Sequence, residues 1–190
     1  MNLDLYNNEF FEWHLNHVHN DCVSAGFLLP KYYYIKSAYD FGCGIGSFLQ
    51  GIKIQNSNIK VTGFEIGVDA KKYINKTIRR NIKTGVNVFE LEGLKRRNLS
   101  ICLEVAEHID PENSEKLVNL ICESTNKYII FSAAPAEQDG LGHINCHDKQ
   151  YWIDLFKKHD WDYDELRTNN LLNLWHFIPE YYLNNIMVFV

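Results

Sequence analysis

The sequence contains neither a long apolar run nor a leader segment. Nowhere in its 190 residues do about 18 apolar residues follow one another, the length needed to cross a membrane, and the N-terminus has no basic leader. We therefore expect a cytoplasmic protein that is neither secreted nor membrane-bound. Basic residues are not in excess, because the formal net charge is -5 and the local cluster at residues 95–97 is too short to follow a polynucleotide backbone. Nucleic acid is therefore not an expected partner.

Disulfide and zinc-knuckle patterns are absent too. The five cysteines are an odd number and none of them has C-x-x-C spacing, so we expect reduced thiols. No internal repeat or low-complexity segment occurs. What is present is a composition of 46% hydrophobic and 23% charged residues, close to the globular average, in a chain long enough for one three-layer α/β domain.

Short apolar segments that suit strands alternate with segments of helical periodicity. The expected strands cover residues 36–41, 60–65, 86–91, 99–105, 127–132 and 185–190. The expected helices cover residues 8–26, a segment beginning near 48, and residues 69–80, 111–124 and 148–159. Such alternation predicts a mostly parallel sheet with helices on both faces. We divide this single domain, residues 1–190, into an N-terminal helical segment or lid, 1–34, and a core, 35–190.

A glycine-rich turn follows the first expected strand. Its sequence is Asp40-Phe41-Gly42-Cys43-Gly44-Ile45-Gly46, and a helical pattern begins directly after it. Glycines let the backbone approach a ligand closely, and the N-terminus of a helix offers unpaired N–H groups. Open α/β sheets bind nucleotide-like ligands at such a place. The turn therefore predicts a nucleoside-containing ligand.

Two acidic residues help to choose the ligand. Glu65 ends the second expected strand about 20 residues after the turn, where an acid binds the ribose of either a dinucleotide or S-adenosylmethionine. The dinucleotide pattern G-x-G-x-x-G is broken, because Ser47 stands at its third glycine. Asp40 would repel a pyrophosphate but would attract the ammonium and sulfonium groups of S-adenosylmethionine. The sequence therefore favours S-adenosylmethionine, with a nicotinamide-dependent oxidoreductase as the alternative.

These motifs resemble those of class I S-adenosylmethionine-dependent methyltransferases. Residues 40–46 resemble the first motif of that family, residues 61–65 its second strand with the ribose-binding acid, and residues 103–109 the end of its fourth strand. Residues 131–135, 142–145 and 151–156 resemble a subgroup of small methyltransferase domains of undefined substrate. The resemblance implies a Rossmann-like three-layer sandwich, with a mostly parallel seven-stranded sheet, helices on both faces and an antiparallel C-terminal strand.

The resemblance also implies a set of cofactor-binding residues. Either Glu90 or Glu92 would bind the adenine amino group, and we favour Glu90; Ile66 and Leu103 would hold the adenine between them, unless they are ordinary core residues. The full expected set is Asp40, Phe41, Gly42, Cys43, Gly44, Gly46, Glu65, Ile66, Glu90, Leu91 and Leu103.

Two histidines are candidate catalytic residues. His108 follows the fourth expected strand and could act as a general base oriented by Glu107, although both residues could equally cap the next helix. His143 and Asn145 lie in a loop, residues 133–145, that is longer than an ordinary connector, and we expect them on the acceptor side of the cofactor.

No metal site is expected from the sequence. His143, Cys146 and His147 are three possible ligands within five residues, but a mononuclear site normally takes its ligands from separate elements, and methyl transfer needs no metal.

The expected function is therefore transfer of a methyl group from S-adenosylmethionine, leaving S-adenosylhomocysteine, to an unidentified acceptor. We expect a small molecule rather than nucleic acid as this acceptor, and the oligomeric state stays open. Because no residue is an unambiguous catalytic base, a second alternative is a nucleoside-binding module without catalytic activity.

Overall fold

A computed structural model describes residues 3–138 and 140–190. Met1 and Asn2 of the predicted N-terminal segment, and Asp139 of the predicted loop, lie outside the described residues. Among the described residues, no helix combines the length and the apolar character needed to cross a membrane.

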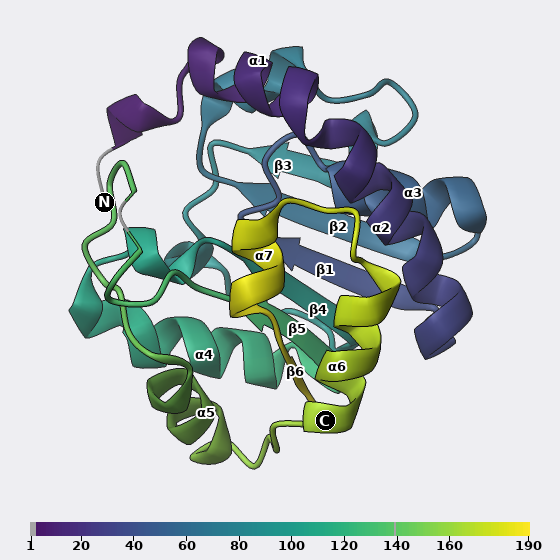
Figure 1. Ribbon diagram of the computed structural model, residues 1–190. Helices are drawn as coiled ribbons and strands as arrows, with labels where there is room; N and C mark the ends of the chain where they lie inside the picture. The colour runs from purple at the N-terminus through teal and green to yellow at the C-terminus, as the bar shows by residue number, and fades with distance from the viewer. Residues whose placement is uncertain (1–2, 139) are drawn as a thin grey trace.

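A mostly parallel sheet forms the centre of the molecule (Figure 1). Its order is β3-β2-β1-β4-β5-β6, in which β6 pairs antiparallel with β5 and the other neighbours are parallel. The six strands within the described residues are β1 (Ser37–Phe41), β2 (Lys60–Glu65), β3 (Ile82–Thr84), β4 (Arg97–Leu103), β5 (Thr125–Ser132) and β6 (Met187–Phe189).

Helices connect the strands and cover both faces of the sheet. The α-helices are α1 (Asn8–His17), α2 (His19–Tyr33), α3 (Ser47–Gln55), α4 (Ser114–Glu123), α5 (Lys149–Lys157), α6 (Glu165–Leu174) and α7 (Glu180–Asn185). The short 3-10 helices are η1 (Leu3–Leu5), η2 (Val68–Lys72), η3 (Arg79–Asn81), η4 (Val88–Glu90), η5 (Ala106–His108) and η6 (Pro111–Asn113).

Each face of the sheet carries its own buried core, because successive strand side chains point to opposite faces. One core joins the sheet to α2, α3, α6 and α7 through Leu29, Ala38, Leu49, Val61, Ile130, Trp175 and Val188. The opposite core joins it to α4 and α5 through Phe41, Phe64, Leu117, Phe131, Trp152, Phe156 and Phe189. Figure 1 shows α2 and α3 on one side of the sheet and α4 and α5 on the other. The predicted three-layer α/β sandwich is therefore confirmed.

The C-terminal part of the chain completes both cores. The indole Nε1 of Trp175 donates a hydrogen bond to the carbonyl of Ala25 in α2 at 3.2 Å. All three residues of β6 are buried, and β6 covers the edge of β5.

The sheet has six strands in the described residues, not the predicted seven. Tyr163 forms only an isolated antiparallel bridge with Phe189 beyond β6, where a further strand would lie. The extended segment is short because Asp164 already caps α6, its carboxylate accepting from the Arg167 amide at 2.8 Å. The antiparallel C-terminal strand itself is confirmed.

The segment between β2 and β4 also differs from the prediction. The third strand is Ile82–Thr84 rather than residues 86–91, because Gly85 turns the chain with φ +70° and Asn87 then caps η4. Residues 69–80 form short 3-10 turns rather than a helix. Within them, Asn75 accepts hydrogen bonds from the Thr77 amide at 3.0 Å and hydroxyl at 2.8 Å, a local bond that competes with the helix.

The N-terminal helical prediction needs one correction. Residues 8–33 form two helices, α1 and α2, rather than one, since Val18 has φ -123° and leaves the helical region between them. Their position matters for the site, because α1 lies over the carboxyl ends of the strands while α2 packs against α3 (Figure 1).

The strand order reverses between β1 and β4, since β2 and β3 lie on one side of this pair and β5 and β6 on the other. In open α/β sheets, ligands bind beyond the carboxyl ends of the strands at such a reversal. The glycine turn after β1 and the segment after β4 both begin at this point.

Candidate functional site

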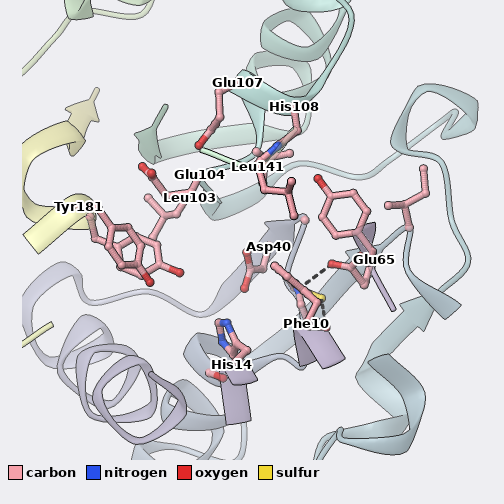
Figure 2. A pocket seen from close by; sticks show the side chains of 18 of the residues that line it. Phe10, His14, Asp40, Glu65, Leu103, Glu104, Glu107, His108, Leu141 and Tyr181 are labelled. Atoms are coloured by element: carbon pink, nitrogen blue, oxygen red, sulfur yellow. Dashed lines mark hydrogen bonds between the residues drawn. The ribbon is translucent and has the colours of Figure 1, made fainter. Parts of the chain in front are cut away.

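A cavity of about 650 Å³ opens at the reversal point. Its walls come from the glycine turn, the ends of β2 and β4, α1, the loop before α5, and α7. Figure 2 shows Glu104, Glu107 and His108 together on one side of the cavity and His14 of α1 on the opposite side, with Asp40 between them.

The glycine turn brings backbone to the floor of the cavity. The Gly42 amide donates to the Phe64 carbonyl at 2.8 Å, which ties the turn to β2. Gly42 has φ +72°, and a Cβ there would lie 2.3 Å from the side chain of Val105, so only glycine fits. A Cβ on Gly44 would meet nothing within 4 Å, so this residue faces open space. The turn therefore leaves room for a ligand directly over Gly44.

Glu65 is held in place by two backbone amides. Its Oε2 accepts from the Gly44 amide at 2.8 Å and its Oε1 from the Gly67 amide at 2.7 Å. Burial raises the pKa of this carboxyl group, and the two amides partly oppose the shift. An ionised carboxylate has about four acceptor positions, so two remain for a ligand. The geometry suits a carboxylate that binds a pair of hydroxyl groups.

Asp40 is a buried carboxylate that lacks a partner on one oxygen. The residue is only 3% exposed, and its Oδ2 has no hydrogen-bond partner among the described residues. Burial, and then the charge of Glu65, raises the pKa of Asp40 well above its usual value. A cationic group in the cavity would remove this cost.

The charge of the cavity is one-sided. Asp40, Glu65, Glu104 and Glu107 line it, and no lysine or arginine lies among its described lining residues. The cavity therefore favours cationic ligands and disfavours phosphates.

Helix α1 and the residues before it form an aromatic wall. Tyr6, Phe10, Trp13 and His14 line the cavity from this side. Burial, with a smaller effect of His19, lowers the pKa of His14 to about 4, so this imidazole is neutral at physiological pH. Burial and the charges of Glu65 and Glu107 raise the pKa of Tyr6 above its usual value. This wall offers apolar surface and neutral hydrogen-bonding groups.

Two more carboxylates follow β4. Glu104 has φ +54°, a strained value for a residue other than glycine, and accepts weakly from Nδ2 of Asn185 at 3.3 Å. Glu107 is fully buried, and neither of its oxygens has a hydrogen-bond partner of normal geometry among the described residues. Burial and the charge of Glu104 raise the pKa of Glu107 well above its usual value, although backbone groups at Glu107 and Ala134 partly oppose the shift.

The two predicted catalytic histidines lie side by side at this end of the cavity. Their rings are 4.9 Å apart with an interplanar angle of 74°. Nδ1 of His108 is 3.2 Å from the Gly142 carbonyl, and Nδ1 of His143 is 3.1 Å from the Gln138 carbonyl. Burial lowers the pKa of His108, opposed by the Gly142 carbonyl. We expected that Glu107 could orient the ring of His108, but no hydrogen bond joins these two side chains among the described residues.

Asn145 fastens the loop that carries His143. It was expected on the acceptor side but is 2% exposed and outside the cavity lining. Its Nδ2 donates to the Ala106 carbonyl and to Oγ of Ser114, both at 2.9 Å. The amides of Ile144 and Asn145 also donate to the Glu107 carbonyl, at 2.8 and 3.0 Å. The loop is therefore anchored at its C-terminal end, because these bonds join it to the segment after β4.

His147 and His143 are close in the sequence, but their side chains have different neighbours in the structure. Its ring stacks on Tyr151 with centroids 3.8 Å apart, and its Nε2 is 3.0 Å from Oδ1 of Asn145. His143 instead meets Glu107 and His108, which come from a separate part of the chain.

Most predicted cofactor residues come together in the structure. The cavity lining includes Asp40, Gly42, Cys43, Gly44, Glu65, Ile66, Leu103, His108 and His143. The others are not part of this lining: Phe41 is buried in the core, Gly46 packs against Ile78 and Ile82, and Leu91 packs at the edge of the second core.

Glu90 also lies away from the cavity. It is exposed and belongs to η4 rather than to a strand, because β3 ends several residues earlier. Glu92 is likewise exposed. The end of β3 therefore brings no acid to the cavity.

Several lining residues were missed in the sequence. Glu104 precedes Glu107 and His108 in an E-x-x-E-H pattern, and this spacing of carboxylates and imidazole was the available signal. No comparable signal marks Tyr6, Phe10 or Tyr181, whose positions in the lining depend on how α1 and α7 dock.

The chain matches no family model and no curated protein. It is similar to many solved structures, among them the three that follow. One is the O-methyltransferase of a trans-AT PKS multienzyme of Brevibacillus brevis, in complex with S-adenosyl-L-homocysteine, at 19% identity and TM-score 0.62 over 95% of this chain and 73% of that chain. Another is the sugar N-methyltransferase KedS8 from Streptoalloteichus, at 9% identity and TM-score 0.67 over 96% and 91% of the two chains.

The third is an O-methyltransferase family protein from Burkholderia thailandensis, at 9% identity and TM-score 0.66 over 95% of this chain. The chain spans only 57% of that structure and 55% of a similar one from Nostoc punctiforme. At these identities, the likeness shows a shared fold.

Proposed function

The chain has the fold of the class I S-adenosylmethionine-dependent methyltransferases, and we propose that it binds S-adenosylmethionine in the cavity and transfers the methyl group to an acceptor. The observation that carries this proposal is the charge of the cavity, which has four carboxylates and no lysine or arginine among its described lining residues. A cofactor with an ammonium, a sulfonium and a ribose diol matches this lining better than one with a pyrophosphate.

Residues at the glycine turn fit the cofactor. The unpartnered Oδ2 of Asp40 would accept from the ammonium group, and Glu65 would accept from the ribose hydroxyls with its two free acceptor positions. Ile66 and Leu103 offer apolar surface on the same cavity for the adenine. With Glu90 exposed, adenine recognition would depend on these apolar contacts and on backbone groups.

When bound, S-adenosylmethionine supplies an electrophilic methyl group on its sulfonium. The protein contributes alignment and exclusion of water, because this displacement requires no covalent enzyme intermediate. Phe10 and Trp13 of α1 would close one side of the cavity. His108 and His143 line the end of the cavity away from the glycine turn, and they would face the acceptor.

Titration calorimetry of the purified protein with S-adenosylhomocysteine and, separately, with NAD tests the proposal. We expect binding of the first compound and none of the second. Ser47, where a third glycine would stand in a dinucleotide site, is buried and hydrogen-bonded to Nδ1 of His19 at 2.7 Å, which fits this expectation. Binding of NAD alone would favour the oxidoreductase, and binding of neither compound would overturn the proposed cofactor.

Catalysis needs a separate measurement. Incubation with methyl-labelled S-adenosylmethionine and a panel of small hydroxyl and amine compounds should give label transfer to at least one of them. Tight cofactor binding without transfer to any acceptor would favour a nucleoside-binding module instead.

A further inference from the structure

Three potential ligand side chains converge beside the cofactor cavity. One oxygen or nitrogen atom from each of Glu107, His108 and His143 lies within 4.8 Å of the others. Glu107 and His108 follow β4, whereas His143 comes from the loop before α5, so two separate segments bring the group together. Figure 2 shows Glu107 and His108 with Glu104 on this side of the cavity.

A cation at this place would stabilise the ionised form of Glu107. Its side chain is fully buried, and both carboxylate oxygens lack a hydrogen-bond partner of normal geometry among the described residues. An unpaired buried charge is costly, and no lysine or arginine is present in the described lining to neutralise it. A second carboxylate, Glu104, adds negative charge instead of removing it.

The two histidines are fixed with one nitrogen free. A carbonyl oxygen can only accept, so Nδ1 of His108 must donate to Gly142 and Nδ1 of His143 must donate to Gln138. In both rings Nε2 is then the unprotonated nitrogen of the neutral form. Metal-binding histidines usually have this arrangement, with the second ring nitrogen donating to a carbonyl or carboxylate.

A role as general base for either histidine explains less. It does not explain why both oxygens of Glu107 lack a partner. It also does not require two imidazole rings whose centroids are 4.9 Å apart. A bound cation satisfies Glu107 and both free ring nitrogens at once.

We propose that Glu107, His108 and His143 bind one divalent cation of the first transition series. Two imidazoles and one carboxylate form a typical open site for Zn²⁺ or Mn²⁺, while Mg²⁺ and Ca²⁺ prefer ligands that are all oxygen. Glu104 lies on the same side of the cavity but outside this group of three, where it would accept from a water on the ion.

The site would define the acceptor class, an extension that rests on the proposed methyl transfer. All three ligands line the cavity, so a free position on the ion would face the acceptor. Such ions bind and polarise oxygen groups. The acceptor is therefore a hydroxyl compound rather than an amine or a carbon nucleophile.

Calorimetry with Mn²⁺, Zn²⁺ and Mg²⁺, on tag-free protein treated with a chelator and then desalted, tests the ion site directly. Loss of the free Mn²⁺ signal in electron paramagnetic resonance gives a second measure. We expect one Mn²⁺ or Zn²⁺ per chain and weaker Mg²⁺ binding. His143→Ala and Glu107→Gln should each weaken Mn²⁺ binding at least about tenfold, the scale on which such sites respond to altered ligation.

His147→Ala is the matched control, because His147 is in the same segment but stacks on Tyr151 away from the group. It should bind Mn²⁺ like the wild type. Equal Mn²⁺ affinity in all four proteins, absence of stoichiometric binding, or Mg²⁺ binding as tight as Mn²⁺ binding would overturn the proposed site.

S-adenosylhomocysteine binding, measured in chelator on the same variants, separates this proposal from the proposed function. Retained binding in His143→Ala and Glu107→Gln would show that their loss of Mn²⁺ affinity does not come from misfolding. If wild-type protein binds Mn²⁺ but not S-adenosylhomocysteine, the methyltransferase proposal fails and the ion site stands.

Discussion

At Glu65, one carboxylate both holds the glycine turn and faces the cavity. It accepts from the amides of Gly44 and Gly67 and retains two acceptor positions. We expect Glu65→Ala to weaken S-adenosylhomocysteine binding by about 2 to 3 kcal/mol, the scale of losing charge-assisted hydrogen bonds to a buried ligand. Titration calorimetry measures the loss.

Glu90→Ala is the control for that substitution, since Glu90 is exposed and outside the cavity lining. The Glu90→Ala protein should bind S-adenosylhomocysteine with the affinity of the wild type. Unchanged affinity in a folded Glu65→Ala protein would remove Glu65 from the site.

Single residues differ in how far the sequence could place them. Gly42, Gly44 and Glu65 were predictable, because a turn after one strand and an acid ending the next strand meet wherever those strands are neighbours in a parallel sheet. The position of Glu90 was not, because it depends on where β3 ends. The meeting of His143 with Glu107 depends on how a distant loop docks, which no local pattern encodes.

Among the elements, the loop before α5 depends on Asn145. Its buried Nδ2 bonds the Ala106 carbonyl and Ser114, so Asn145→Ala leaves these acceptors without a donor. We expect a loss of about 1 to 3 kcal/mol in the free energy of unfolding, the usual cost of unsatisfied buried groups. Urea denaturation followed by circular dichroism measures this loss.

Asn169→Ala, at an exposed position of α6, is the control and should leave the free energy of unfolding unchanged. If both alanine variants are equally stable, the Asn145 bonds do not hold the loop.

Helix α1 presents adjacent aromatic side chains to different surroundings. Phe11 is fully buried and its ring approaches Gly67 and Tyr73, whereas Phe10 is 41% exposed and lines the cavity. We expect Phe11→Ala to lower the free energy of unfolding by about 3 to 5 kcal/mol and Phe10→Ala to lower it by less than about 1 kcal/mol. Thermal and urea unfolding of the two variants give the comparison, and equal losses would contradict the expected difference between the buried Phe11 and the exposed Phe10.

The elements themselves were predictable where burial alone decides. Strands β1, β2, β4, β5 and β6 lie where apolar runs predict them, and Trp152, Leu155 and Phe156 of α5 are all buried as their spacing indicates. The helix predicted for residues 69–80 was wrong, although the apolar periodicity suits a helix. The Asn75 side chain bonds its near neighbour Thr77, and such local bonds compete with the hydrogen bonds of a helix.

For the whole molecule, buried carboxylates make stability depend on pH. The pKa of Glu107 is raised well above 4.5 by burial and by Glu104. Its stabilising contribution is therefore complete below the unfolded pKa and is lost as the pH rises through the folded pKa. We expect Glu107→Gln, in chelator, to be more stable than the wild type at mildly alkaline pH, with the difference shrinking as the pH falls toward 4.5.

Buried histidines act in the opposite direction. The pKa of His14 is lowered to about 4, so its contribution is present above 6.5 and is lost as the pH falls through about 4. Comparing variant and wild type at each pH isolates Glu107 from this effect. Glu92→Gln, at an exposed site, should show no such trend, and a pH-independent difference for Glu107→Gln would contradict the raised pKa.

The pairing of β6 with β5 has a consequence for synthesis on the ribosome. Until Met187–Phe189 has emerged, β5 has an open edge that carries Ile129, Ile130 and Phe131. Open apolar edges invite pairing between chains. A nascent chain stalled before residue 187 would thus be a target for chaperones, because α5, α6 and α7 are translated between β5 and the strand that shields it.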